Sequence, residues 1–244
     1  MKRVKRIRPE DTAALDAVFL YAGILDAYEA VGVELIGPNV LDDHVLPRMV
    51  HYVREFLPEA FSERTDLDGL AAELKAFLTK FRQVVAEARA AGSAKGLTLE
   101  DIWKLRAAIF GFESVFIKIL GEAAIKNYVL IRIADILSAY LPSSLLDPRT
   151  DIITKLDTYA RYIREQGFVK FARVSLEDGA IAVAANKCAF ARIHDSEAYR
   201  NLDVRFCPWA MIASAIVAAH EGKEAVLESS LFTTSGSVSK IRTK

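Results

Sequence analysis

Cys207 is the residue with the most chemistry to offer, because it stands directly before Pro208 and a run of small and apolar residues. Proline suits the first turn of a helix, since its missing N–H would have no partner there. The dipole at a helix amino terminus favours a thiolate and lowers the pKa of a thiol. Two interpretations stay open: a reactive cysteine, and a buried cysteine that packs as a small apolar residue, which is the commoner role.

A metal site is the second possibility. Zinc prefers cysteine and histidine ligands, and the last third of the chain holds Cys188, His194, Cys207 and His220. Their spacing matches no C-x₂-C or H-x₃-H pattern, so we expect no metal, and no nucleotide or other cofactor signature is present. A separate pair, His44 and His51, would share one helix face; without a third ligand we expect surface residues.

The composition narrows the class of protein. Lys+Arg and Asp+Glu both number 32, so the net charge is zero and nucleic acid is not an expected partner. Only two cysteines occur, which fits a reducing cytoplasm. The basic start of the chain is followed by Pro9 and acidic residues rather than an apolar stretch, so we expect neither a secretory signal nor a membrane span.

The clearest structural signal is a hairpin. Residues 168–176 and 180–185 alternate apolar and polar side chains around Asp178-Gly179, a pair suited to a type I′ turn. This turn predicts that Leu176 lies opposite Ile181 and that Val174 lies opposite Val183, all on one buried face.

A buried helix and two further strands complete this unit. Residues 207–220 are small or apolar on every side, which predicts a helix that is covered all round, and Gly222 suits its left-handed cap. Strands are predicted at residues 224–232 and 237–242. The order strand, strand, helix, strand, strand would make a four-stranded antiparallel sheet.

The residues before this unit are predicted to be helical. Apolar side chains at three-and-four spacing indicate helices over residues 10–30, 42–56, 66–91, 98–140 and 151–166, with Gly32 ending the first. The fourth is long, so we expect a break at Gly111 or Gly121, or one helix used for dimerisation. The fold class is therefore α+β, with a helical region at 1–95 and an α+β domain at 96–244.

A resemblance to a known family concerns residues 120–241. The features that carry it are a helix ending at Gly167-Phe168, a C-x-F-A segment (Cys188, Phe190, Ala191), a small-residue helix opened by Cys207, and G-K-E-x-x-L-E-S from Gly222, followed by Gly236. Together these resemble the V4R (4-vinyl reductase) or hydrocarbon-binding domain family, whose fold is shared with Bet3-type tethering-complex subunits. Many members carry a cysteine on each side of the late glycine, where this chain has none.

The resemblance implies binding of an apolar or aromatic small molecule, in a sensory or regulatory role. We expect a homodimer formed through the amino-terminal and central helices. The ligand would lodge where the sheet meets the buried helix, although a filled core there is the alternative. The expected ligand-binding residues are Phe168, Val174, Ile181, Val183, Cys188, Phe190, Cys207, Trp209 and Ile212. Two other functions stay open: an assembly subunit without a ligand, and an enzyme that uses Cys207.

Overall fold

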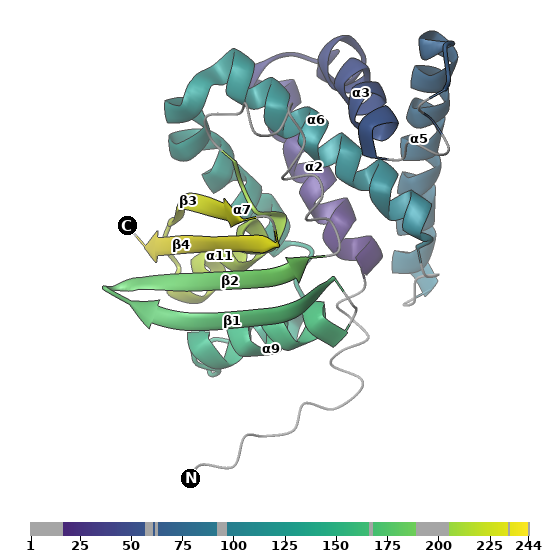
Figure 1. Ribbon diagram of the computed structural model, residues 1–244. Helices are drawn as coiled ribbons and strands as arrows, with labels where there is room; N and C mark the ends of the chain where they lie inside the picture. Colours follow the sequence, from purple (N-terminus) through teal and green to yellow (C-terminus); the bar gives the residue numbers. More distant parts are fainter. Residues whose placement is uncertain are drawn as a thin grey trace.

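The protein has an α+β fold in which helices come first and a four-stranded antiparallel sheet comes last (Figure 1). The computed structural model describes residues 17–56, 61, 63–91, 97–165, 168–188, 205–233 and 235–243. The expected helix start at residue 10, the predicted helix stop at Gly167, and the predicted residues Phe190 and His194 lie outside these ranges. The predicted fold class is confirmed.

The amino-terminal layer contains α2 (Ala17–Leu35), the π-helical turn η1 (Leu41–Val45), α3 (Leu46–Phe56) and α5 (Leu67–Ala91). The prediction that Gly32 ends the first helix is wrong, because α2 runs on to Leu35. Gly32 serves packing instead: a Cβ there would lie 3.2 Å from Val40 Cγ1 and 3.3 Å from Phe116 Cε1. The missing side chain therefore lets the helix that carries Phe116 and the end of α2 approach closely.

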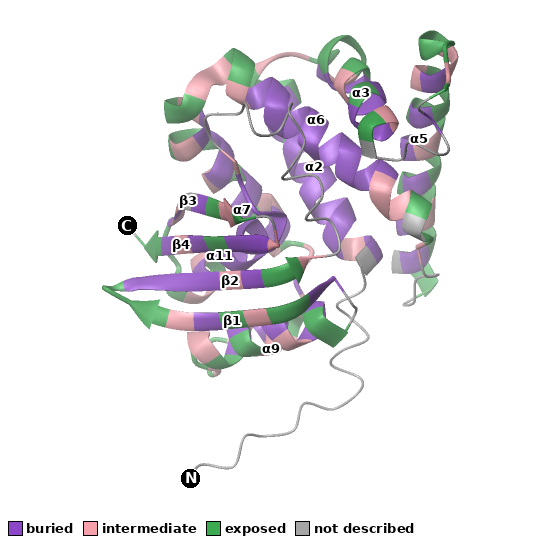
Figure 2. Ribbon diagram, viewed as in Figure 1, coloured by how far each residue is buried: buried purple, intermediate pink, exposed green. Residues whose placement is uncertain are grey.

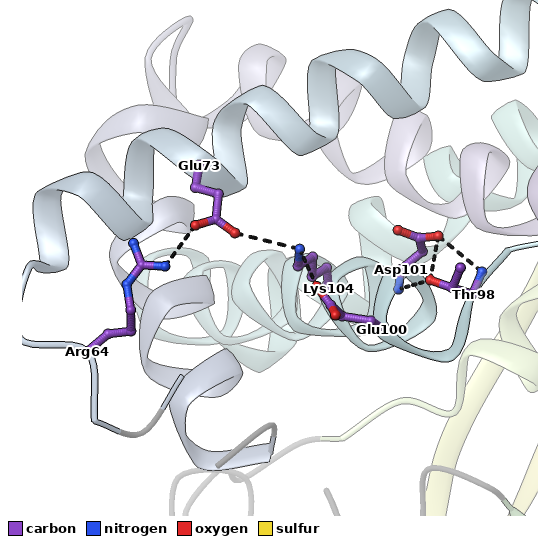
Figure 3. Close-up of polar contacts among 6 residues, drawn as sticks. All are labelled: Arg64, Glu73, Thr98, Glu100, Asp101 and Lys104. Atoms are coloured by element: carbon purple, nitrogen blue, oxygen red, sulfur yellow. Dashed lines mark hydrogen bonds and ion pairs between the residues drawn. The ribbon is translucent and has the colours of Figure 1, made fainter. Parts of the chain in front are cut away.

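The long helical stretch is broken at Gly121. It consists of α6 (Leu99–Ala124), η2 (Ile125–Val129) and α7 (Leu130–Ser138), and Gly121 has the non-helical angles φ 76° and ψ 166°. A positive φ is accessible to glycine at little cost. Of the two predicted break points, Gly121 is confirmed and Gly111 stays helical. Thr98 caps the start of α6, since its side chain accepts a hydrogen bond from the Asp101 N–H (Figure 3).

A short helix, α8 (Ser143–Leu146), and α9 (Ile152–Glu165) lead from α7 to the sheet. Residues 141–150 lie between two predicted helices, and α8 is a further helix that was not predicted there. Pro142 immediately precedes this helix with extended angles, φ −66° and ψ 149°, and a following Ser-Ser-Leu-Leu segment can close one turn that buries Leu145.

The sheet consists of β1 (Val169–Glu177), β2 (Ala180–Cys188), β3 (Ala225–Thr233) and β4 (Gly236–Thr243), in the order β1-β2-β4-β3. The predicted pairs Leu176–Ile181 and Val174–Val183 are both confirmed. Asp178 and Gly179 have φ values of 51° and 73°, as a type I′ turn requires. Leu176 is nevertheless 66% exposed, because the turn end of the hairpin extends beyond the helices that cover the sheet (Figure 1).

Helix α11 (Pro208–Glu221) is the buried helix that the sequence predicts, and Gly222 caps it in the left-handed conformation. It packs against the inner face of the sheet and against α7 and α9. The buried apolar side chains form a single cluster that includes residues on both sides of the predicted boundary near residue 95 (Figure 2). Among the described residues, no helix is long and apolar enough to cross a membrane.

Candidate functional site

The joint between the sheet and α11 is the predicted ligand site, and three aromatic rings occupy part of it. Phe168 stacks on Trp209 with ring centroids 4.8 Å apart. Tyr21 of α2 meets both rings edge-on, at 6.2 Å from Phe168 and 6.4 Å from Trp209. The rings cover one another, as side chains of a close-packed core do.

The other predicted residues divide between the joint and its surroundings. Val174, Ile181 and Val183 belong to the inner face of the sheet and to the same buried cluster as Ile212 of α11. Cys207 is buried, whereas Cys188 is half-buried. The structure thus brings seven of the predicted positions into one cluster and places Cys188 against it. None of these residues lines the cavities described below.

Cys207 is surrounded by serines from the last two strands. Its backbone N–H donates a hydrogen bond to Ser230 Oγ at 3.1 Å, and Ser230 Oγ lies 2.8 Å from Ser239 Oγ. Burial raises the pKa of the Cys207 thiol, although a hydrogen bond with the Ser237 side chain opposes this effect. A neutral, buried thiol is a poor nucleophile, so the geometry favours the packing role of Cys207.

A buried carboxyl group lies on α6, on the side that faces α11. Glu113 is 2% exposed, and its Oε1 accepts a hydrogen bond from the Phe206 backbone N–H at 2.6 Å. Burial raises the pKa of Glu113 to about 8, although Phe206 and the buried Arg106 guanidinium oppose the shift. That guanidinium lies 4.9 Å from the Phe110 ring centroid and 5.9 Å from that of Trp209. Glu113 can therefore hold a proton near neutral pH.

Three buried polar atoms make no hydrogen bond with any described residue: Glu113 Oε2, Tyr21 Oη and Trp209 Nε1. Burial also raises the pKa of Tyr21 far above its ordinary value, which keeps the hydroxyl protonated. Buried polar atoms without hydrogen-bond partners lower the stability of the folded state. The apolar packing around these atoms must offset that loss.

An apolar cavity lies elsewhere, between α2 and α5. Its volume is about 400 Å³. Phe112 of α6 contributes to the lining, and most of the remaining walls are aliphatic or aromatic. The apolar side chains that line it include Leu25, Leu41, Leu78, Phe81, Val85 and Phe112. A lining of this kind with a few polar groups is typical of small-molecule sites.

The polar residues of this cavity form contacts with other side chains of the protein. Asp26 accepts a hydrogen bond from the Tyr140 hydroxyl, and Arg82 of α5 forms an ion pair with Glu29 of α2. The two carboxylates and one guanidinium leave one net negative charge in the lining. A ligand with a hydrogen-bond donor at one end would find an acceptor in Asp26.

Polar contacts hold the outer helix α5 against the rest of the layer. Glu73 accepts from Arg64 at 2.9 Å and lies 3.7 Å from Lys104 Nζ, which also pairs with Glu100 at 2.7 Å (Figure 3). Lys75 pairs with Asp42 at 2.7 Å. Exposed ion pairs contribute little, with a median below about 1 kcal/mol each. The position of α5, and so the width of the cavity, depends mainly on its apolar face.

The cavity wall is connected to α11 by two contacts. The Phe112 ring stacks on Tyr28 with centroids 5.9 Å apart. The Tyr28 hydroxyl in turn donates to Met211 Sδ at 3.6 Å. Phe112 is also the neighbour of Glu113 along α6. A molecule that moved the Phe112 ring would therefore act on the contact between Tyr28 and Met211 of α11 and on the neighbouring Glu113.

Metal-binding groups do not converge in the part of the chain that the structure describes: no three histidine, cysteine, aspartate or glutamate side chains could share an ion there. His220 instead lies beside a buried lysine, with 3.1 Å between its Nδ1 and Lys155 Nζ. Burial lowers the pKa of Lys155.

Comparison with known proteins leaves the family open. No protein-family model, curated protein or solved structure matches the chain. The resemblance to the hydrocarbon-binding family thus stays a prediction.

The sequence did not predict the buried carboxyl group of Glu113, the serines around Cys207 or the apolar cavity. Glu113 was visible as a carboxylate in an apolar helix, but its burial depends on α11, far away in the chain. Ser237 and Ser239 alternate along β4, and this pattern could have indicated a polar stripe on the sheet. Nothing local signals the cavity, because it requires α2 and α5 to diverge.

Proposed function

We propose that the protein binds an apolar small molecule in the cavity between α2 and α5. The observation that carries this proposal is an open cavity of about 400 Å³ with a mainly apolar lining and a short polar edge. Filling such a space removes apolar surface from water, which is worth roughly 25 cal/mol per Å² of area covered. The resemblance to hydrocarbon-binding domains supports the same class of ligand, although it expects the ligand beside Trp209.

The polar edge narrows the chemistry of the ligand. Asp26 can accept a hydrogen bond, and the lining carries one net negative charge, so a hydroxyl or amine at one end of an otherwise apolar molecule suits it best. A carboxylate at that end would meet Asp26 and Glu29 and would be repelled. The expected ligand is therefore an apolar or aromatic molecule with one donor group.

The test uses a neutral fluorescent probe, N-phenyl-1-naphthylamine, whose emission rises in apolar surroundings. In Ala86→Trp the indole enters the cavity from α5, and we expect probe affinity to fall at least about tenfold, equivalent to 1.4 kcal/mol. The matched control is Ala76→Trp on the outward side of the same helix, which should bind as the unaltered protein does. Equal affinity in both variants, or no binding by the unaltered protein, would reject the proposal.

A second candidate function is assembly, and the outer face of the sheet favours it. Phe171, Val238 and Leu231 project from this face with exposed fractions of 58%, 41% and 70%, and Leu231 and Val238 are cross-strand partners. Light scattering of Leu231→Asp would separate the possibilities. Loss of self-association places the contact on the sheet, whereas an unchanged dimer supports the predicted contact through the helices.

A further inference from the structure

A second cavity, of about 470 Å³, lies between α6 and the segment formed by η1 and α3. It differs from the apolar cavity in chemistry, because cationic and hydrogen-bonding side chains line much of it. We propose that this polar cavity binds a phosphomonoester, a small organic molecule that carries one phosphate group. The proposal is independent of the apolar site, since the two cavities share no lining residue.

Positive charge is the first argument. Arg48 of α3 and Lys118 of α6 both line the cavity, and neither forms an ion pair with a described residue. Asp43 is the single carboxylate in the lining. The lining therefore has one excess positive charge before any imidazole is protonated. Cations that lack partners inside one concave site are available to an anionic ligand.

The number of donors is the second argument. His44 and His51 also line the cavity and each can offer an N–H group. Because His51 Nε2 lies 3.6 Å from Glu55 Oε2, His44, Arg48 and Lys118 are the three side chains whose donors can all turn to one ligand, more than the two oxygens of a carboxylate require. A phosphate group has three strong acceptor oxygens and carries a charge of about −1.5 to −2 near neutral pH. Its acceptors and its charge therefore match the donors and the positive charge of this lining.

The buried side of the cavity is rigid. Tyr52 is buried and is hydrogen-bonded to the side chain of Ser114, whose hydroxyl also donates to the Gly111 carbonyl at 3.0 Å. A Cβ at Gly111 would lie 3.0 Å from Val45 Cγ1 and 3.2 Å from the Val45 carbonyl oxygen. The glycine therefore lets η1 lie directly on α6, and π-helical turns of this kind occur frequently at functional sites.

The apolar part of the lining indicates an organic ligand rather than inorganic phosphate. Pro47, Val115 and Ile119 share the cavity with the cations, and Ile119 is 48% exposed although it is a large aliphatic residue. An aromatic or aliphatic group attached to the phosphate would cover it. The helical layer would then hold two sites, one for an uncharged apolar molecule and one for an organic phosphate.

Isothermal titration calorimetry of the full chain with phenyl phosphate tests the proposal. We expect saturable binding that weakens at least about tenfold in Lys118→Gln and in Arg48→Gln, the loss typical of one charge-assisted hydrogen bond. Lys170→Gln, which removes the same charge from exposed strand β1, should leave the affinity unchanged. Lys118 is exposed, so that variant retains the fold even if Arg48→Gln does not.

Two further probes distinguish the ligand class. Benzyl alcohol lacks the charge and fits the apolar cavity instead, so its affinity should be the same in Lys118→Gln, Arg48→Gln and the unaltered protein. Benzoate should bind more weakly than phenyl phosphate. Retained affinity for phenyl phosphate in Lys118→Gln, an equal loss of affinity for benzyl alcohol in that variant, or no heat with phenyl phosphate would each overturn the proposal. Benzoate binding as tightly as phenyl phosphate would overturn the assignment to phosphate.

Discussion

The backbone N–H of Phe206 donates a hydrogen bond to Glu113 Oε1 at 2.6 Å, across 93 positions of the chain. This contact joins α6 to the residues that precede α11 and places a carboxyl group where water does not reach it. Two consequences are measurable: the dependence of stability on pH, and the effect of removing the charge.

The free energy of unfolding should fall as pH rises. Because burial raises the pKa of Glu113 to about 8, the native state binds more protons than the unfolded state between the two pKa values. The contribution of Glu113 is therefore fully present below an unfolded pKa of about 4.3 and is lost as pH passes about 8. Linkage makes the loss about 4 kcal/mol between about pH 5 and about pH 9.

Glu113→Gln tests this origin by urea denaturation at both pH values. The variant cannot ionise, so its stability should change less with pH, and near pH 9 it should exceed that of the unaltered protein. Glu165→Gln, at an exposed position of α9, should retain the original slope. A Glu113→Gln protein with the same slope would show that another group titrates.

Cys207 should react slowly with a thiol reagent in the native protein. Its side chain is buried and burial raises its pKa, so both access and thiolate fraction are low. In Cys188→Ser, dithionitrobenzoate should label no thiol rapidly until denaturant is added, when one thiol appears. The control is Cys207→Ser, in which the half-buried Cys188 should react faster. Rapid native labelling of Cys207 would support the enzyme hypothesis instead.

Gly236→Ala should destabilise the sheet strongly. A Cβ at this position would overlap the Ala185 carbonyl and lie 2.8 Å from Asn186 Cα, so β2 and β4 could not keep their register. We expect a loss of more than about 3 kcal/mol in the free energy of unfolding, as for other severe steric changes. Ser235→Ala, in the adjacent turn, should cost far less. A small loss in Gly236→Ala would mean that the β2–β4 pairing is loose.

Phe168→Ala should reveal whether the joint beside Trp209 is filled. Truncation of a closely packed phenylalanine typically costs about 3–5 kcal/mol, and the Phe168 ring lies 4.8 Å from Trp209. The control is Phe171→Ala, which removes a 58% exposed ring nearby and should cost less than about 1 kcal/mol. Equal effects in both variants would indicate that the predicted cavity exists there after all.

Local sequence signals predicted the parts of this fold that local physics controls. Asp178-Gly179 sets the hairpin register, and Gly121 breaks the long helix. Both the turn and the break require a positive φ, which these residues adopt. Gly32 shows the limit of the same reasoning. A glycine can end a helix or allow a close contact, and only the distant Phe116 decides between them.

The candidate sites were less accessible to prediction, because they depend on gaps between elements. Apolar stripes on α2 and α5 identify the faces that turn inward but do not show how far apart these faces lie. His44 and His51 were correctly placed on exposed helical turns. Their neighbours Arg48 and Lys118 join them only because α6 crosses α3.

The strand order has a consequence for how the chain acquires its shape. β1 with β2, and β3 with β4, are hairpins that close within a few residues, whereas the β2–β4 pairing must bridge α11 and the segment before it. Short closures are fast and long ones slow. We therefore expect each hairpin to form before the two dock around α11, so that docking is the slow step in completing the sheet.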